Sequence, residues 1–356
     1  MHVAIGYNWF PTAAGYHLER ALSSLGHVVT YVGLPADRRP GYDNTVSVSD
    51  IISALPRSPD LFVWVDPAGR YFPPGIEDLP IPTVCYLIDV HLGTWRHQAA
   101  RFFDGVFIAQ KDYLDTFRRA VGHDQVYWMP LAAAPDVHRR HDLPKIFEVG
   151  FVGNIARAHR KTSRSRRLDL IADRFRVNDF YRSYTPDEVG RVYSQSQIVF
   201  NTSIAGDVTM RVFEGAACGA LVVTDSVANG LSELYEIGRE IITYNDDADL
   251  LDRLSYFVGH DEERAKIALA GHQRTLSQHT YSHRALEMVS TASNDRFERC
   301  SPMRAASQRV REAARREVYI HLHMLDAIFD SARAACASPT VRFWRALPCL
   351  IRRMLM

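Results

Sequence analysis

The 356-residue sequence is poor in cysteine and has no long hydrophobic run. Its five cysteines are widely scattered and form no C-x-x-C pair, which excludes the dense disulfide framework of a small secreted domain. No apolar run approaches the roughly 20 residues that span a bilayer. The start of the chain lacks the basic and apolar regions of a signal peptide. We therefore expect a cytoplasmic protein that is not integral to a membrane.

The sequence also lacks an excess of charge of either sign. Lys and Arg number 42 against 41 Asp and Glu, a formal net charge of +1. Without a strong overall field, nucleic acid is not an expected partner, and an anionic membrane would have to bind a local patch. The first strand-to-helix turn, residues 6–11, reads Gly-Tyr-Asn-Trp-Phe-Pro. It lacks the G-x-G-x-x-G fingerprint, which argues against a nicotinamide dehydrogenase.

What the first part of the chain does contain is a regular alternation of apolar runs and helical periodicity. Val3–Ile5, then Leu18, Leu22 and Leu25 at helical spacing, then Val28–Val32 predict a βαβ unit. Four more apolar runs continue the rhythm: Leu61–Val65, Thr83–Ile88, Val106–Ala109 and Val126–Met129. This pattern predicts a parallel sheet covered by helices, a Rossmann-like lobe over residues 1–140.

A second lobe of the same kind is expected over residues 141–296. Four further strands are predicted at Phe147–Val152, Ile198–Asn201, Ala220–Thr224 and Glu240–Tyr244. The predicted fold class is therefore α/β, with two Rossmann-like parallel-sheet lobes facing across a cleft. Ligands of such sheets bind beyond the carboxyl ends of the strands, so the loops there are the candidate site.

The last segment, residues 297–356, differs from both lobes. From Cys300 onward it has ten Arg, no Lys and four acidic residues, which predicts a basic helical extension. Large apolar residues alternate with arginines between Phe343 and Arg353, as in helices at membrane interfaces. Peripheral contact with the inner face of a membrane, or with a partner, is one interpretation. A helix packed back across the lobes is the other.

A basic loop of the second lobe has the composition of a diphosphate site. The strand at 147–152 is followed by Gly153 and Asn154, and residues 157–167 contain six Arg or Lys, Arg160 and Lys161 among them, with no acid. Glycine admits close approach of an anion, while basic side chains supply charge-assisted hydrogen bonds. A solvated loop or a nucleic-acid patch is the alternative, and the latter is weaker because no aromatic residues are interleaved.

Three more polar residues of the second lobe fall at the expected site. Asn201 ends a strand, and Arg211 and Glu214 lie in the first turns of the next predicted helix. There Arg211 can meet phosphate, and Glu214 can accept hydrogen bonds from the hydroxyls of a ribose. A glutamate near a helix N-terminus also simply complements the helix dipole.

In the first lobe, Asp89 and His91 follow the strand Thr83–Ile88. If the backbone stays extended, positions two apart face the same side, and both side chains point into the cleft. A histidine held by a carboxylate can take a proton from an acceptor hydroxyl. The alternative is that Asp89 caps the next helix and His91 packs. Gly15, before the first helix, allows close approach of a ligand or serves a tight turn.

No metal site is expected. The acidic stretch of residues 245–249 precedes an apolar periodic segment, so these acids cap a helix rather than bind a cation.

Taken together, these motifs resemble the group 1 glycosyltransferases, and most closely the spore-maturation-type branch. The resemblance extends over roughly residues 147–286 and rests on five segments: Gly150–Asn154, Ile198–Asn201, Arg211–Gly219, Asn229–Leu234 and Glu240–Tyr244. Residues 103–107 and 129–133 agree more loosely. The resemblance implies the GT-B fold and metal-independent transfer from a nucleotide-diphosphate sugar, a co-substrate rather than a cofactor, with the retaining stereochemistry common in that family.

The same resemblance implies roles for individual residues. Glu214 matches the family glutamate that binds the donor ribose, and Gly153, Arg160 and Lys161 fall among the diphosphate contacts. Many members carry another acid eight positions before that glutamate, whereas position 206 here is glycine and the acid is Asp207.

Three functions stay open on the sequence alone. The first is transfer to a hydroxyl of a glycan, lipid-linked or protein acceptor, as in bacterial glycan or glycoconjugate biosynthesis. The others are nucleotide-sugar epimerisation and non-catalytic binding of a nucleotide sugar on the same fold.

Overall fold

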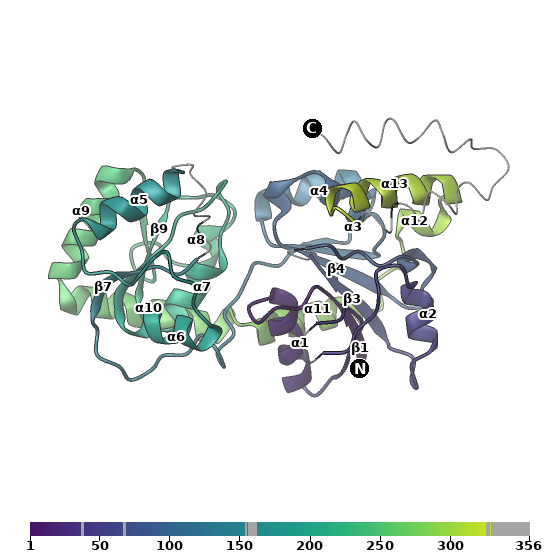
Figure 1. Cartoon of the computed structure of the whole chain (residues 1–356), viewed down its shortest axis with the longest axis horizontal. Helices are drawn as coiled ribbons and strands as arrows, with labels where there is room; N and C mark the ends of the chain where they lie inside the picture. The colour runs from purple at the N-terminus through teal and green to yellow at the C-terminus, as the bar shows by residue number, and fades with distance from the viewer. Residues whose placement is uncertain (37–38, 67–68, 154, 156–161, 325–327, 329–356) are drawn as a thin grey trace.

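The chain folds into two α/β lobes joined side by side (Figure 1). The computed structural model describes residues 1–36, 39–66, 69–153, 155, 162–324 and 328. In the described residues, each lobe is built on one parallel sheet, as the sequence predicts.

The sheet of the first lobe has six parallel strands in the order β2-β1-β3-β4-β5-β6. They are β1 His2–Gly6, β2 Val28–Tyr31, β3 Leu61–Val65, β4 Thr83–Leu87, β5 Gly105–Ile108 and β6 Val126–Trp128. Each falls on a strand expected from the apolar runs. Parallel strands of this kind are buried on both faces, and β1, β3, β4 and β5 are buried along their whole length.

Side chains alternate between two cores, one on each face of this sheet. Val3 and Ile5 of β1 join a core with α1 (Ala14–Ser24), whereas Ala4 joins the opposite core. That opposite core is covered by three helices of the lobe: α2 (Val48–Ser53), α3 (Trp95–Ala100) and α4 (Leu114–Val121).

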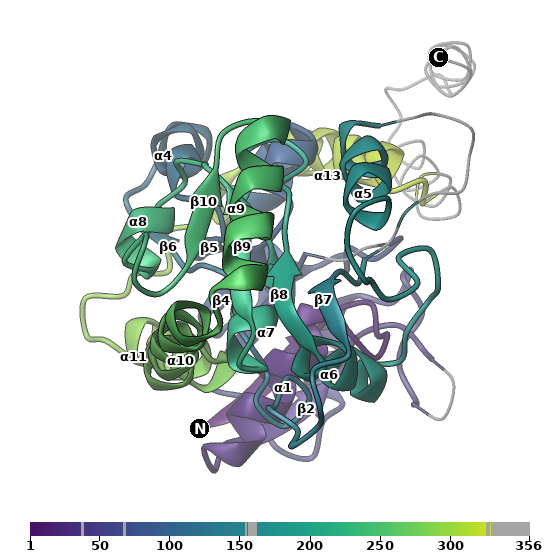
Figure 2. The same ribbon diagram turned by 90° about the vertical axis from the view of Figure 1, so that its left-hand side faces the viewer.

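The second lobe has a four-stranded parallel sheet in the order β10-β9-β8-β7. The strands are β7 Phe147–Gly150, β8 Ser196–Phe200, β9 Leu221–Asp225 and β10 Ile242–Tyr244. Among the described residues of this lobe, six helices accompany the strands: α5 Ser163–Ala172, α6 Pro186–Ser194, α7 Met210–Ala217, α8 Leu231–Leu234, α9 Asp247–Gly259 and α10 Asp261–Gln278. Figure 2 looks onto this lobe and shows α9 in front of the sheet.

The chain crosses between the lobes twice, and the two crossings lie against each other. Ala133 of the outgoing segment forms a bridge with Thr280 of the returning one, through the bonds Ala133 N to His279 O and Tyr281 N to Ala133 O, both 2.9 Å. The returning helix α11 (Tyr281–Ala292) then packs on α1 of the first lobe. It completes the core on that face of the first sheet.

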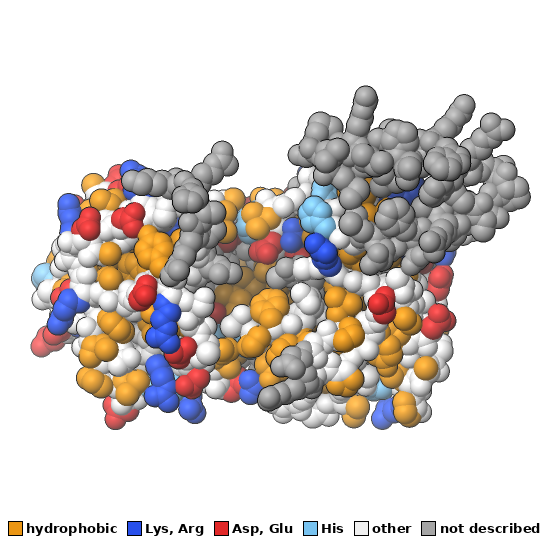
Figure 3. Space-filling model, in the orientation of Figure 1, with side chains coloured by type: hydrophobic (Ala, Val, Ile, Leu, Met, Phe, Trp, Pro, Cys, Tyr) orange, Lys and Arg blue, Asp and Glu red, His pale blue; other side chains and the backbone are white. Residues whose placement is uncertain are grey.

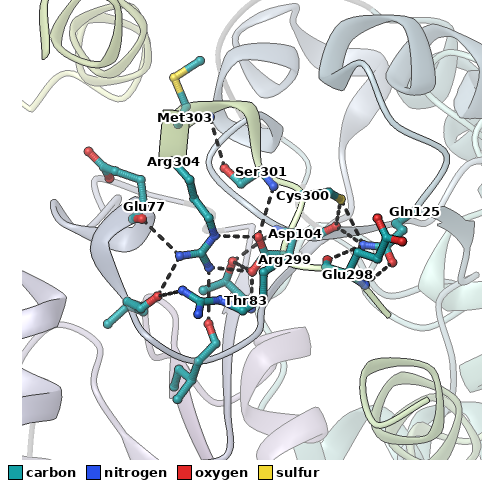
Figure 4. Close-up of polar contacts among 12 residues, drawn as sticks. Glu77, Thr83, Asp104, Gln125, Glu298, Arg299, Cys300, Ser301, Met303 and Arg304 are labelled. Atoms are coloured by element: carbon teal, nitrogen blue, oxygen red, sulfur yellow. Dashed lines mark hydrogen bonds and ion pairs between the residues drawn. The ribbon is translucent and has the colours of Figure 1, made fainter. Parts of the chain in front are cut away.

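The extension after α11 is attached to the first lobe (Figure 4). Its helices α12 (Pro302–Ala305) and α13 (Gln308–His321) contact the first lobe, and α13 packs on α3. The fully buried carboxylate of Asp104 accepts hydrogen bonds from Arg304 Nε at 2.8 Å and Nη2 at 2.6 Å. Arg304 also donates to the carbonyl oxygens of Leu79 and Ile81.

The described part of the extension thus packs back on the protein. The segment with interfacial character, Phe343–Arg353, lies outside the described residues. No helix among those the structure describes is long and apolar enough to cross a membrane.

Candidate active site

A cavity of about 320 Å³ lies between the lobes, at the carboxyl ends of both sheets. The surface is hollowed along this boundary, and hydrophobic side chains lie in the recess (Figure 3). From the first lobe, the lining residues follow β1, β3, β4 and β5, and those of the second lobe come from α5 and the segment leading into α7. The cavity therefore lies where open parallel sheets bind ligands.

Gly15 lines this cavity in the first turn of α1. A Cβ atom at this position would lie 2.4 Å from Cγ of Tyr7, the residue that follows β1. Only glycine lets the helix approach the strand end so closely. Gly15 thus has a packing role beside the one predicted for a ligand. Sequence reasoning did not select Tyr7, Asn8, Phe10 or Thr12, which line the same wall.

Asp89 also lines the cavity, next to a buried ion pair. Asp66, at the end of β3, accepts a hydrogen bond of 2.5 Å from Nε of Arg96. Burial, and then the charge of Asp66, raises the pKa of the Asp89 carboxyl. A carboxyl group with a raised pKa beside a cavity is suited to proton transfer.

His91 does not stand beside Asp89 in the way expected. Strand β4 ends at Leu87, and Val90–Leu92 form a 3-10 turn, so the premise of extended backbone is wrong. The His91 side chain is 3% exposed, and its Nε2 lies 3.8 Å from Oδ1 of Asp207, across the lobe boundary. Neither ring nitrogen has a hydrogen-bond partner in the described part of the chain. The ring therefore faces an acid of the other lobe.

From the sequence, Asp207 was identified only as an acid one position after the place, residue 206, where many family members carry one. Its Oδ1 accepts hydrogen bonds from the backbone amides of Ile204 at 2.7 Å and Ala205 at 3.2 Å. The preceding Gly206 has φ +78, a left-handed conformation that is strained for other residues. Backbone conformation thus accounts for a glycine at position 206, and the turn carries the acid at 207 into the cleft.

Arg211 and Asn201 are brought together, but much of their bonding capacity is used inside the lobe. Arg211 donates from Nε to the carbonyl of Val152 at 2.9 Å and from Nη1 to Oδ1 of Asn201 at 2.7 Å. Its guanidinium also stacks on Phe151, 4.1 Å from the ring centroid. The Asn201 amide nitrogen donates to Thr224. Arg211 lines the cavity, whereas Asn201 is not among the lining residues and positions Arg211 through their hydrogen bond.

The basic loop is described only in part. A Cβ at Gly153 would lie 2.5 Å from Nη2 of Arg211, so this glycine packs under the guanidinium. Asn154, Arg160 and Lys161 lie outside the described residues. Arg164, the second residue of α5, lines the cavity and donates to the carbonyl of Thr202 at 3.2 Å.

Two arginines of the second lobe therefore line the cavity together. Burial, and then the charge of Arg211, lowers the pKa of Arg164. Because the two positively charged guanidinium groups repel each other, an anion bound between them would stabilise both.

Glu214 faces the crossing between the lobes. Its side chain is 15% exposed, and Oε1 lies 3.5 Å from Nε2 of the buried His138. Burial raises the pKa of the Glu214 carboxyl, with Arg211 as the main opposing charge, and burial lowers the pKa of His138 to about 4. The carboxylate is therefore near the cleft without being among the residues that line the cavity.

The acidic stretch 245–249 behaves as a helix start. Asp246 is the N-cap of α9, accepting hydrogen bonds from the amides of Ala248 and Asp249, both at 2.9 Å. Within the described residues there is no cluster of His, Cys, Asp or Glu that could hold a metal ion.

Comparison with protein families gives a match that covers the second lobe. Residues 151–290 match the family model described as Glycosyl transferase-like. A comparison with curated protein sequences gave no match.

Solved structures resemble the chain over both lobes. A glycosyltransferase from Rickettsia africae ESF-5 has a TM-score of 0.58 and 10% identity, covering 82% of this chain and 97% of that one. Alr3699/HepE from Anabaena, solved with UDP and glucose, has a TM-score of 0.58 and 12% identity, covering 82% and 99%. Sucrose-phosphate synthase (tll1590) from Thermosynechococcus elongatus has a TM-score of 0.54 and 11% identity, covering 82% and 98%.

The chain thus has the GT-B fold that the sequence resemblance implies, and its second lobe matches the Glycosyl transferase-like family model. None of these comparisons identifies the spore-maturation-type branch.

Proposed function

We propose that the protein is a glycosyltransferase that moves a sugar from a nucleotide-diphosphate donor to an acceptor hydroxyl. The observation that carries this proposal is the interlobe cavity. Its second-lobe wall lies within the region that matches the glycosyl transferase-like model and includes Arg164, Asp207 and Arg211. A cleft between two lobes can exclude water, so that transfer outcompetes hydrolysis of the donor.

Arg164 and Arg211 are proposed to hold the donor diphosphate. Both line the cavity, and an anion between them would relieve their mutual repulsion. As the glycosidic bond breaks, negative charge grows on the leaving diphosphate, and preorganised guanidinium groups stabilise that charge. Asn154, Arg160 and Lys161 remain proposed diphosphate contacts on the basis of the sequence. Gly153 and Asn201 contribute by holding Arg211 in position.

Glu214 is proposed to bind the donor ribose. Its carboxylate lies 3.5 Å from His138, so the ribose hydroxyls would replace or share that contact. The donor base and sugar are unassigned. The complexes of Anabaena HepE with UDP and with UDP-glucose make uridine nucleotides the first candidates to test.

In the first lobe, Asp89 and His91 are the proposed groups for proton transfer from the acceptor. Asp89 lines the cavity, and burial raises the pKa of its carboxyl, which favours a role in proton transfer. His91 and Asp207 meet from the two lobes, where a sugar hydroxyl can bond both. Transfer without a metal ion, and with retention, is part of this proposal. The acceptor binds on the first lobe, where Phe10 and Thr12 reach the cavity.

The test is a panel of nucleotides and nucleotide sugars, measured by thermal shift and by release of the nucleoside diphosphate. Ligand that binds the folded state raises the melting temperature, by an amount equivalent to about 2.7 kcal/mol at a hundred times Kd. Arg164→Met is expected to weaken diphosphate binding at least tenfold, because a charge-assisted contact contributes about 1.5–3 kcal/mol.

The matched control is Arg166→Met. Arg166 belongs to the same basic stretch, but its side chain is 63% exposed and pairs with Asp247. Equal loss in both variants, or no binding of any nucleotide, would contradict the donor site. Product analysis without acceptor separates transfer from epimerisation. Tight binding without turnover across many acceptors would instead favour a non-catalytic binding protein.

A further inference from the structure

Two residues that follow β5 in the first lobe, Gln110 and Asp112, hold the second lobe on both sides of Asp207, Asp112 through Asn229 of the second lobe. The first is Gln110, which is 1% exposed. Its side-chain Oε1 accepts a hydrogen bond from Val208 N at 3.0 Å, and its Nε2 donates to Val208 O at 3.4 Å. One side-chain amide thus holds both backbone groups of the residue that follows Asp207. A backbone segment held at both groups has little freedom to shift.

The second contact is a reciprocal pair between Asp112 and Asn229. Asp112 N donates to Asn229 Oδ1 at 3.1 Å, and Asn229 N donates to Asp112 Oδ2 at 3.2 Å. The remaining amide group of Asn229, Nδ2, donates to the carbonyl of Gly206 at 2.6 Å. Asn229 is 6% exposed and has φ +41, a left-handed conformation that asparagine tolerates well. Through Asn229, the first lobe is connected to the residue that precedes Asp207.

Asp207 is therefore flanked on both sides by backbone that is bonded, directly or through Asn229, to the first lobe. The same lobe supplies His91, whose Nε2 lies 3.8 Å from the Asp207 carboxylate. We infer that Gln110, Asp112 and Asn229 form an interlobe clasp, and that its role is to position Asp207 against His91 at the donor sugar. The three residues are positioning residues that act through Asp207, and the inference rests on the proposed transferase function.

A neighbouring contact provides a built-in control. Lys111, between two clasp residues, forms an ion pair with Glu233 of the second lobe, with side chains 35% and 53% exposed. This pair joins the same two segments, but neither side chain bonds to residues 206–208 in the described structure. If these contacts affect transfer only by holding the lobes together, removing either one should reduce the rate. If the clasp acts by positioning Asp207, only removing the clasp should reduce it.

The decisive variant is Asn229→Gly, which removes the side-chain bonds and keeps the left-handed backbone. With the donor found in the panel above, we expect kcat of transfer to fall about 100-fold, as misplacement near 1 Å does, with donor KM changed less than about threefold. In an Asp207→Asn background, Asn229→Gly should have little further effect, because residues acting as a unit are not additive. Glu233→Gln should change kcat less than about twofold.

A second variant guards against misfolding of the first. Asp112 is exposed, and Asp112→Ala should reproduce part of the loss in kcat, while Asp112→Asn keeps an acceptor for the Asn229 amide and should restore it. Additive effects of Asn229→Gly and Asp207→Asn, or a loss in Glu233→Gln as large as in Asn229→Gly, would overturn the clasp. If the wild type transfers sugar and Asn229→Gly does so at the same rate, the clasp is overturned and the proposed function stands. Absence of transfer by the wild type overturns the proposed function, and the clasp with it.

Discussion

Single residues at the lobe boundary show where local sequence was informative and where it was not. The position of Arg211 in the first turn of α7 followed from residue type and spacing. The helix cap in the acidic stretch 245–249 was predicted and is confirmed at Asp246. The juxtaposition of His91 and Asp207 could not be predicted, because it joins two lobes and depends on a 3-10 turn in one and the left-handed Gly206 in the other. Periodicity describes neither feature.

His17 is another residue whose environment the sequence did not reveal. It lies on α1, is 2% exposed, and its ring packs against His138 and Tyr281 at the crossing between the lobes. Neither ring nitrogen has a hydrogen-bond partner among the described residues. Burial, and then the neighbouring His138, lowers the pKa of His17 to about 4.

This lowered pKa predicts how stability depends on pH. The unfolded histidine takes up a proton near pH 6.5, whereas the folded one resists protonation until about pH 4. The contribution of His17 is thus fully present above pH 6.5 and is lost as the pH falls toward 4. Between pH 7.5 and pH 5 the loss is about 2 kcal/mol. Calorimetric melting across this range should therefore show a smaller decline for His17→Phe than for the wild type.

The surface residue His260 supplies the control, because His260→Gln should keep the wild-type slope. A decline in His17→Phe as steep as in the wild type would show that the buried ring does not contribute to the pH dependence.

At the scale of whole elements, the ten strands within the described residues lie where apolar runs predicted them. Most of them are buried on both faces, and such strands appear in a sequence as continuous hydrophobic segments. The position of the C-terminal extension could not be predicted from the sequence. Its many arginines suggested either a membrane surface or the protein itself. Residues 301–321 pack on the first lobe, where Arg304 pairs with Asp104, a buried acid some 200 positions earlier. Composition alone does not identify Asp104 as the partner.

The Arg304–Asp104 pair gives an element-scale prediction. Asp104 is fully buried, and Arg304→Met would remove two of its charged donor bonds. Breaking a buried ion pair from one side leaves an uncompensated charge and costs about 3–5 kcal/mol. We expect a lower melting temperature and faster proteolysis between α11 and α13.

Asp78→Asn is the comparison for this variant. Asp78 pairs with Arg311 of the same extension, but its side chain is 57% exposed. An exposed pair contributes at most about 1 kcal/mol, so this variant should melt close to the wild type. Similar losses in the two variants would mean that burial of Asp104 is not what holds the extension.

For the molecule as a whole, the sequence predicted two similar lobes and a cleft, but not how the lobes are joined. Strand and helix patterns repeat within each lobe and carry no information on their relative orientation. That orientation is set by the paired crossings at Ala133 and Thr280 and by α11, which lies in sequence after the second lobe and packs on the first. The relative orientation of the lobes is therefore set by contacts between residues some 150 positions apart in the sequence.

Arg284 connects these two crossings and is the basis of the last prediction. It is 5% exposed and donates from Nε to Pro130 O at 2.7 Å and from Nη2 to Leu131 O at 3.2 Å. It also donates to Gln278 O on the returning segment. Arg284→Met would leave these buried carbonyls without their charged donor, a loss of about 2–5 kcal/mol.

Because the lost bonds join the lobes, we expect calorimetry of Arg284→Met to separate unfolding into two transitions, one for each lobe, where the wild type unfolds with greater cooperativity. Arg274→Met is the matched control. Arg274 lies in α10 and bonds Glu240 and Gln278, both within the second lobe's part of the chain. It should lower stability without separating the transitions. If both variants separate them equally, the crossing does not couple the lobes, and their orientation must be maintained by the contacts at the cleft.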